Sequence, residues 1–206
     1  MMAQLSETEI ANKPFILLGT AQRISNINDT SVLATQIREC WQITVPAILA
    51  DHPWNFALRR VQINRDGDYV PETLVGQYRY RLPQDCLRWL PPDRGDADWF
   101  DAQEESGFLL CDDEGPIVVR YIGDERDITR WSALFIDALC YKLAYELSES
   151  VSADQSLRDR MEAGYEAAIG KARSRDGLAT GRTQRQSYMV RSRLIASRHR
   201  PAGYGY

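Results

Sequence analysis

Hydrophobic residues recur at the three- and four-residue spacing of an α-helix near the start of the chain and again after residue 127. In the first such stretch, residues 6–18, Ser6 and Glu9 stand at the spacing of a capping box. Gly19 follows the last apolar residue and is a plausible end signal. We therefore predict a short helix over residues 6–18.

A longer helical pattern covers residues 29–50. Asn28 or Asp29 is expected to cap its start. Pro46 lies inside the pattern and is expected to kink the helix or to end its regular part, because proline lacks the amide hydrogen that the helix needs. The dipeptide His52-Pro53 is expected to end the helix.

The middle of the chain has a different pattern, in which glycine, proline and aspartate separate short apolar stretches. The strands expected from these stretches are residues 77–82, 86–90, 99–102, 107–111 and 117–122. Residues 112–115 separate the last two at hairpin spacing, so a hairpin is expected there. The region should form a small antiparallel sheet.

Helical spacing returns at Asp127 and continues to residue 147, and a further helix is expected over residues 152–173. The short connector between them, residues 148–152, predicts that the two helices lie antiparallel. After Gly177 the helical spacing fades. The remaining stretch has no long apolar face, so we predict that it forms an arm and does not fold on its own.

These elements predict an α+β fold, mainly α: a helical bundle with an inserted small antiparallel β subdomain and an extended C-terminal arm. The bundle is assigned to residues 1–60 and 124–176, and the β subdomain to residues 61–123. The basic C-terminal arm is assigned to residues 177–206.

Charge is distributed unevenly between the two ends of the chain. Residues 171–206 hold nine Lys or Arg residues against one acid, Asp176, which gives +8. The whole chain carries −4, so subtracting +8 leaves −12 for residues 1–170. With 44% hydrophobic residues the chain can bury a core and is not of the disordered class. An acidic body with a basic tail indicates an interaction role for the tail.

Several protein classes are not expected. The longest apolar run, residues 45–50, is far shorter than the ~20 residues that span a bilayer. The start MMAQLSETEI has no signal-peptide pattern, so a reducing cytoplasm is the expected site of synthesis. Neither cofactor nor metal is expected, because no glycine-rich phosphate loop occurs and the cysteines form no CxxC pair. The four scattered cysteines are Cys40, Cys86, Cys111 and Cys140.

Four stretches together resemble the tail tubular protein A family of podoviruses, the short-tailed bacteriophages. They are the opening helix with the polar turn 28–31, the string Leu49 to Ala57 (LADHPWNFA), the string Tyr78 to Arg88 (YRYRLPQDCLR), and the helical pair from Asp127 to Arg173. The resemblance spans about residues 6–176. The strings HPWNFA and LPQDCLR are specific, and their order makes chance agreement improbable.

The resemblance implies a head-to-tail adaptor of the virion. Such a protein is expected to form a ring of twelve copies between the portal protein and the tail nozzle protein, with tail fibres as a further candidate partner. DNA would pass through the ring without sequence-specific binding and without a membrane partner. The protein would be found in the virion tail at the head–tail interface, and in the host cytoplasm during assembly.

The motif residues are interpreted as structural. A histidine followed by Pro-Trp resembles a catalytic motif, but the sequence offers no nucleophile in a recognisable elbow. We expect the aromatic side chains to fill the place where helix meets sheet, and Asp85 to satisfy nearby amides after the turn at Pro83. The residues assigned this role are His52, Pro53, Trp54, Phe56, Pro83 and Asp85.

Two alternatives to an adaptor stay open. One is a hydrolase of peptidoglycan or nucleic acid that uses Glu104, Glu105 or Asp113. We expect no such turnover, because the sequence shows no complete catalytic constellation. The acidic cluster to which the two glutamates belong is interpreted as an exposed, solvated loop, and in a ring its charge would keep DNA from adhering. The acids of that cluster are Asp96, Asp98, Asp101, Glu104 and Glu105. The other alternative is a DNA-binding protein that uses the basic arm.

The arm itself is interpreted as a docking segment. Apolar residues lie among its arginines, and they offer anchors to a groove on the portal or on a neighbouring subunit. A tail that only neutralises phosphates needs no such anchors. The residues expected to dock are Arg182, Arg185, Tyr188, Met189, Arg191, Arg193, Leu194 and Ile195.

Overall fold

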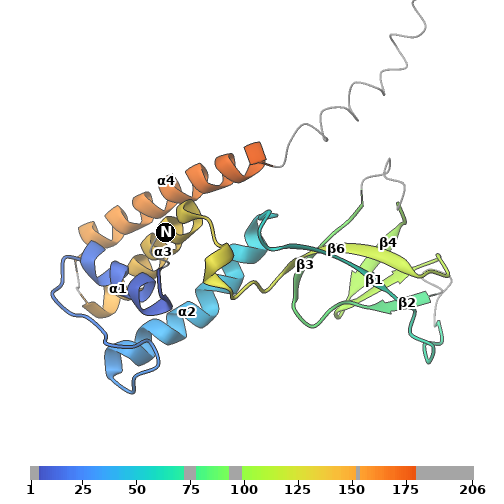
Figure 1. Ribbon diagram of the computed structural model, residues 1–206, viewed down its shortest axis with the longest axis horizontal. Helices are drawn as coiled ribbons and strands as arrows, with labels where there is room; N and C mark the ends of the chain where they lie inside the picture. The colour runs from blue at the N-terminus through green and yellow to red at the C-terminus, as the bar shows by residue number, and fades with distance from the viewer. Residues whose placement is uncertain (1–4, 72–77, 93–98, 152–153, 180–206) are drawn as a thin grey trace, which may run out of the picture.

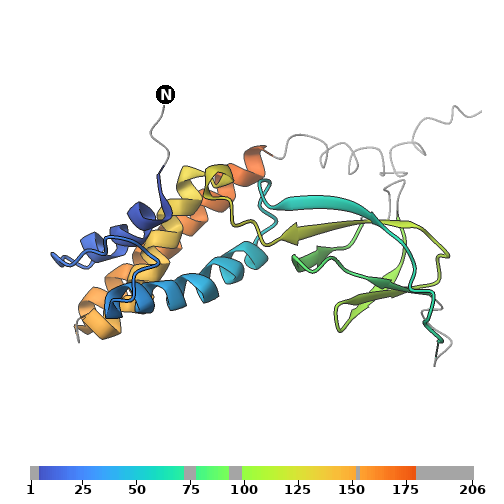
Figure 2. The same ribbon diagram turned by 60° about the horizontal axis from the view of Figure 1, so that its bottom comes forward.

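The computed structural model describes residues 5–71, 78–92, 99–151 and 154–179. It confirms the expected α+β class, mainly α. The described chain forms two lobes, with the helices at one end and all six strands at the other (Figures 1 and 2). Each lobe has its own cluster of buried hydrophobic side chains, so each has its own core.

The first helix, α1 (Glu7–Leu17), begins as the sequence predicted. The hydroxyl of Ser6 accepts a hydrogen bond from the Glu9 amide, and the Glu9 carboxylate accepts one from the Ser6 amide at 2.6 Å. Both bonds satisfy amides that the first helical turn leaves without partners. Gly19 follows with a positive φ of 73°, which a residue without a side chain adopts without strain.

Helix α2 (Val32–Asp51) differs from its prediction at its start. Its N-cap is Ser31, whose hydroxyl accepts from the Ala34 amide. Asp29 does not cap, because its carboxylate instead accepts from the Asn26 amide in the turn before the helix. The helix continues through Pro46 to Asp51, in agreement with the expected range to residue 50, and His52 then leaves the helical conformation as expected.

The second half of the bundle begins with a short 3₁₀ turn, η1 (Ile128–Arg130), and continues with α3 (Ala133–Val151) and α4 (Gln155–Ala179). Helix α3 runs through most of the predicted connector. Helix α4 runs past its predicted end at residue 173, because Gly177 keeps helical backbone angles. The expected antiparallel arrangement is confirmed, since Arg158 lies over the Tyr145 ring, whereas the earlier Tyr141 lies against the later Gly164.

Helix α3 is the centre of the bundle and contacts α1, α2 and α4. Its buried positions fall on every side of the helix, as expected of a helix surrounded by others. They are Phe135, Ala138, Leu139, Cys140, Leu143, Ala144, Leu147 and Ser148. Within the described chain, the helices include none with the length and apolar character to cross a membrane.

The β lobe consists of two three-stranded antiparallel sheets. One has the order β1-β6-β3 and the other the order β2-β5-β4. A bridge between Arg65 and Tyr80 connects the chain just after β1 to β2. The strands are β1 (Leu58–Ile63), β2 (Tyr78–Arg81), β3 (Cys86–Leu90), β4 (Ala102–Glu105), β5 (Phe108–Cys111) and β6 (Ile117–Gly123). The β lobe therefore begins at Leu58, a little before the predicted boundary at residue 61.

The predicted hairpin at residues 112–115 is wrong. This segment crosses from β5 in one sheet to β6 in the other. The hydroxyl of Tyr80 in β2 donates to the Asp113 carbonyl at 2.7 Å, and this hydrogen bond holds the crossing segment against β2. The tight hairpin lies instead at Ser106-Gly107, where both residues have positive φ and join β4 to β5.

Candidate assembly site at the waist

The two lobes meet at a waist, which we define as residues 52–59, 82–86 and 121–131. The chain crosses it twice, once between α2 and β1 and once between β6 and η1 (Figure 1). The HPWNFA string forms the first crossing, and the LPQDC string lies against the second through Asp85. The two strings, distant in sequence, therefore meet at one place.

Trp54 fills the centre of the waist and is fully buried. Its indole nitrogen donates to the Ile48 carbonyl at 2.9 Å, near the end of α2. Its ring stacks on Phe56 at 5.8 Å and meets Phe135 of α3 edge to face at 5.2 Å. The indole thus places its polar edge on a backbone acceptor and its ring in the core, the arrangement that makes a buried tryptophan favourable.

Asp176 on α4 binds the turn that contains the HPWN residues. The Asn55 amide donates to its carboxylate at 3.2 Å, and the Asn55 side chain donates to the Asp176 backbone carbonyl at 2.8 Å. His52 Nε2 lies 3.2 Å from the same carboxylate. The last turns of α4 are thereby held against the end of α2. Sequence reasoning missed this role, although Asp176 is the single acid in a basic segment.

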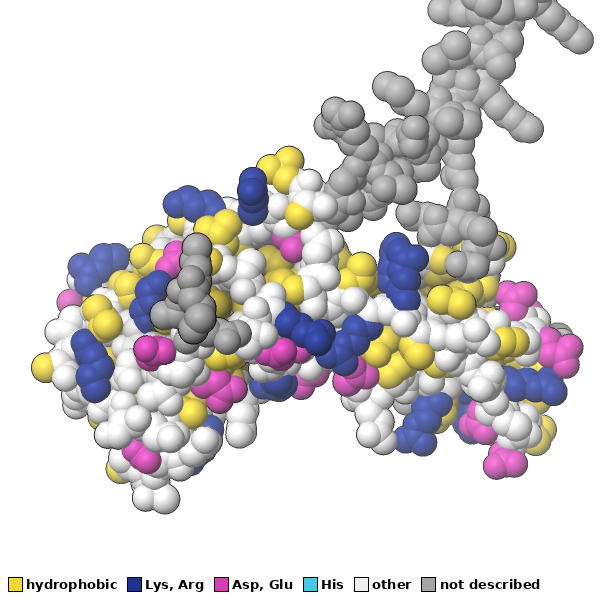
Figure 3. Space-filling view, viewed as in Figure 1, with side chains coloured by type: hydrophobic (Ala, Val, Ile, Leu, Met, Phe, Trp, Pro, Cys, Tyr) yellow, Lys and Arg dark blue, Asp and Glu magenta, His cyan; other side chains and the backbone are white. Residues whose placement is uncertain are grey.

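A second ionic cluster lies on the β side of the waist. Arg59 of β1 binds both Asp85 and Glu125, and Arg130 binds Glu125 at 3.2 Å. Glu125 is only 5% exposed, so these two guanidinium groups compensate a carboxylate that burial would otherwise make costly. Figure 3 shows basic and acidic side chains next to each other at this place.

The expected role of Asp85 needs a correction. Its carboxylate accepts from the Tyr121 hydroxyl at 3.2 Å and binds the Arg59 guanidinium, so it serves side-chain donors and not the backbone amides that we expected. Burial, with the Asp85 charge next to it, raises the pKa of Tyr121, so the hydroxyl remains a donor. The turn itself forms as expected, with the Cys86 amide donating to the Pro83 carbonyl at 3.0 Å.

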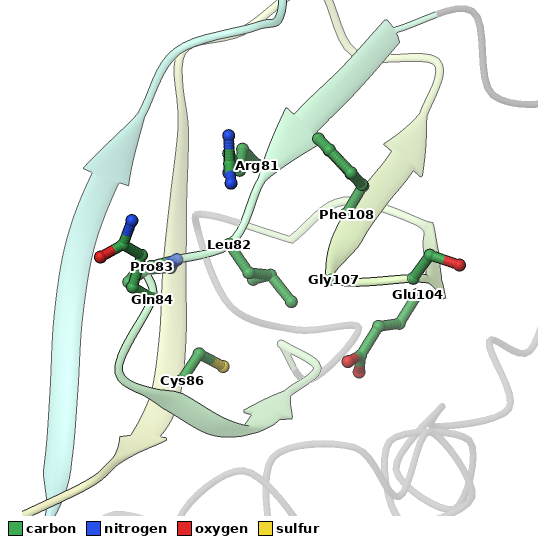
Figure 4. Close-up of a pocket in the computed structure, with 9 residues that line it drawn as sticks. Arg81, Leu82, Pro83, Gln84, Cys86, Glu104, Gly107 and Phe108 are labelled. Carbon is green, nitrogen blue, oxygen red and sulfur yellow. The ribbon is translucent and has the colours of Figure 1, made fainter.

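A pocket of about 260 Å³ opens beside this turn, between the start of β3 and the β4–β5 hairpin (Figure 4). Leu82, Cys86 and Glu104 are among the residues that line it. Burial, with the carboxylates of Glu104 and Asp85 nearby, raises the pKa of Cys86 to about 11. The thiol is therefore protonated at neutral pH, and it lacks the thiolate form that a nucleophile or metal ligand needs.

This pKa predicts how Cys86 reacts with an alkylating reagent. A shift from 9.0 to about 11 lowers the thiolate fraction at neutral pH by a factor of about 100. Labelling of Cys86 by iodoacetamide should be slow at pH 7 and should rise about tenfold per pH unit towards pH 10. Peptide mass spectrometry would measure it, with the fully buried Cys140 as a control that stays unlabelled while the protein is folded. Fast labelling of Cys86 at pH 7 would contradict the assignment.

The acids of the hydrolase alternative do not form one site. Glu104 and Glu105 are consecutive in β4, so their side chains project to opposite faces of the strand. Asp113 follows the far end of β5, whereas Glu105 is paired with its first residue, Phe108. Asp96 and Asp98 lie outside the described residues. Among the residues that the structure describes, no three His, Cys, Asp or Glu side chains gather in a way that could hold a metal ion.

The residues expected to dock, from Arg182 to Ile195, also lie outside the described part of the chain. The described chain ends at Ala179, less than one helical turn beyond Asp176. The arm therefore starts close to the waist.

The class defined by these features is an α+β chain of two lobes, joined by an aromatic and ionic waist. A scan of the sequence against models of known protein families gave no match, and a search of curated proteins found no similar chain.

Proposed function

We propose that this protein is a structural head-to-tail adaptor of a short-tailed bacteriophage, forming a ring between the portal and the tail nozzle. The observation that carries the proposal is that the HPWNFA and LPQDC strings both bind the end of β6 at the waist, where the Gly123 amide donates to the Ala57 carbonyl and the Asp124 amide donates to the Asp85 carbonyl. These strings carry the resemblance to the tail tubular protein A family, and here they build the joint of the molecule. Residues at such a joint set how the two lobes are oriented, and therefore set the shape of the subunit.

The two-lobed shape fits a protein that connects two partners. The bundle and the β lobe lie at opposite ends of the molecule, so each can present a surface to a different neighbour (Figure 2). The waist between them holds a buried tryptophan and a compensated buried carboxylate. Packing and paired charges of this kind fix the angle between lobes, which a connector of defined length requires.

The charge distribution fits a channel through which DNA passes. Residues 1–170 carry a net charge of −12. A ring of subunits with this negative charge repels the phosphate groups of DNA, so DNA does not adhere to the ring by electrostatic attraction. The basic segment after residue 171 has the opposite sign and is available for an acidic partner surface.

The test is to mix the full-length protein with the portal protein of the same phage and to image the product by electron microscopy. We expect a ring of twelve copies seated on the portal, and no turnover of peptidoglycan or nucleic acid by the purified protein. An absence of portal binding, or turnover that disappears when one carboxylate is changed to its amide, would refute the adaptor function. Retention of duplex DNA by the arm, without portal binding, would favour the DNA-binding alternative.

A further inference from the structure

One side of the β1-β6-β3 sheet points away from the core of the β lobe and carries three arginines. Successive side chains of a strand project to opposite faces of a sheet. On this sheet the residues of β1 and β6 that face the core are Val61, Ile63, Ile117, Val119 and Tyr121. The opposite side, which we call the arginine face, is formed by Arg60, Gln62, Arg88, Leu90, Val118 and Arg120.

The three arginines start from adjacent positions on this face. Arg60 of β1 is directly opposite Arg120 of β6, with Cα atoms about 4.5–5.5 Å apart as in any antiparallel pair. Arg88 of β3 is opposite Ile122, two residues after Arg120, so it lies diagonally from Arg120. Like charges that face each other across two strands destabilise the pair. An anion bound over the cluster would remove this repulsion.

The arginine face also lacks acceptors of its own. Elsewhere in the lobe, Arg59 and Arg79 bind carboxylates. In contrast, none of the three arginines of the face forms an ion pair within the described chain, and the bond from Arg88 goes to the Asp51 carbonyl at 3.3 Å. The Nε atoms of Arg88 and Arg120 are buried without a hydrogen-bond partner among the described residues. Buried N–H groups without acceptors are unfavourable, so the cluster is incomplete as it stands.

We propose that the arginine face binds an acidic segment of a partner polypeptide, whose carboxylates pair with the guanidinium groups. Arginine can bind a carboxylate through two parallel hydrogen bonds, so the cluster supplies geometry as well as charge. Apolar side chains lie among the arginines, since Val118 is 39% exposed and Leu90 is half-buried opposite Arg120. These two side chains offer contacts to a polypeptide that a phosphate backbone cannot use.

Nucleic acid is the competing anion, and the composition of the face argues against it. Surfaces that bind single strands combine basic groups with exposed aromatic rings on which the bases stack. The arginine face has no aromatic residue, because Trp89 of β3 and Tyr121 of β6 point to the core side. Duplex DNA would also meet the surrounding body, and residues 1–170 carry a net charge of −12 that repels phosphates. Carboxylates are therefore the anions that fit this face.

Photocrosslinking with the full-length chain would test the proposal. A benzophenone amino acid replaces Gln62, which is exposed on the arginine face, or Gln103, which is exposed on the other sheet and serves as the matched control position. The probe is a fluorescent peptide composed of glutamate and leucine. Links to the peptide from position 62 should exceed those from position 103 about tenfold, because the three arginines hold the carboxylates beside position 62. Equal links from the two positions would overturn the proposal, since the basic arm alone would then account for binding.

Charge reversal gives a second readout of the same links. Arg60→Glu should reduce the links from position 62 about tenfold, because the new carboxylate repels the peptide and pairs with Arg120. Arg81→Glu makes the same change of charge on the other sheet and should leave the links unchanged. Both arginines are exposed, so neither change empties the core. Equal losses with the two variants would show a general effect of net charge and would overturn the proposal.

A DNA oligonucleotide is the third probe, and it separates the two kinds of anion. Links from position 62 to the oligonucleotide that exceed those to the peptide, and that disappear in Arg60→Glu, would assign the arginine face to nucleic acid and overturn the proposal. Weaker links to the oligonucleotide than to the peptide are the expected result. These experiments contain no phage protein besides this chain, so their outcome does not depend on the adaptor function.

Discussion

Replacing Trp54 with alanine should lower the free energy of unfolding by about 3–5 kcal/mol, the range for emptying a buried aromatic site. The ring is fully buried, contacts Phe56 and Phe135, and donates to the Ile48 carbonyl. A domain with a total stability of ~5–15 kcal/mol would lose a large part of it. Urea denaturation followed by circular dichroism measures the change.

Trp99 provides the matched control for this measurement, because it is 43% exposed. Trp99→Ala should cost less than about 1 kcal/mol, as expected for a substitution on the surface. Equal midpoints for the two variants would show that Trp54 does not support the waist.

Removing residues 180–206 should abolish stable binding to the portal and leave the body folded. The truncated chain keeps all of α4, including Asp176 and its bonds to Asn55, so its melting temperature should not change. Light scattering with purified portal measures the loss of the complex. Complete portal-bound rings formed by the truncated protein would show that the arm does not dock.

The arginines of the arm allow a finer version of this experiment. Changing Arg182, Arg185, Arg191 and Arg193 together to glutamine should weaken docking, and should leave the remaining binding less dependent on salt than that of the native arm. If docking survives while binding of DNA is lost, the arm binds nucleic acid and not a protein surface.

Local chemistry was readable from the sequence. The capping box at Ser6 and Glu9 and the bounds of Cys86–Leu90 were predicted correctly, because each depends on neighbours within a few residues. Strand β1 was missed, since Arg59, Arg60 and Gln62 interrupt its apolar pattern. Its pairing with β6 depends on contacts about 60 residues away, which local spacing does not encode.

The waist was predictable only in part. The aromatic residues after Pro53 indicated a place where helix meets sheet, and the buried position of Trp54 agrees with that expectation. Its ionic partners were not indicated, because Arg59, Glu125 and Asp176 come from three distant segments. A charged residue looks the same in sequence whether it is solvated or paired in the fold.

The bonds between Asp176 and Asn55 also determine how the subunit would carry tension. A pull on the chain beyond Ala179 loads the last turn of α4 first. Through Asp176 the force reaches the Asn55 turn, and from there the start of β1 at Leu58. This route runs from the end of α4 to the β lobe in addition to the packing of α4 on α3 in the bundle core. Tension on the arm would then be shared between those buried contacts and a set of hydrogen bonds at the waist.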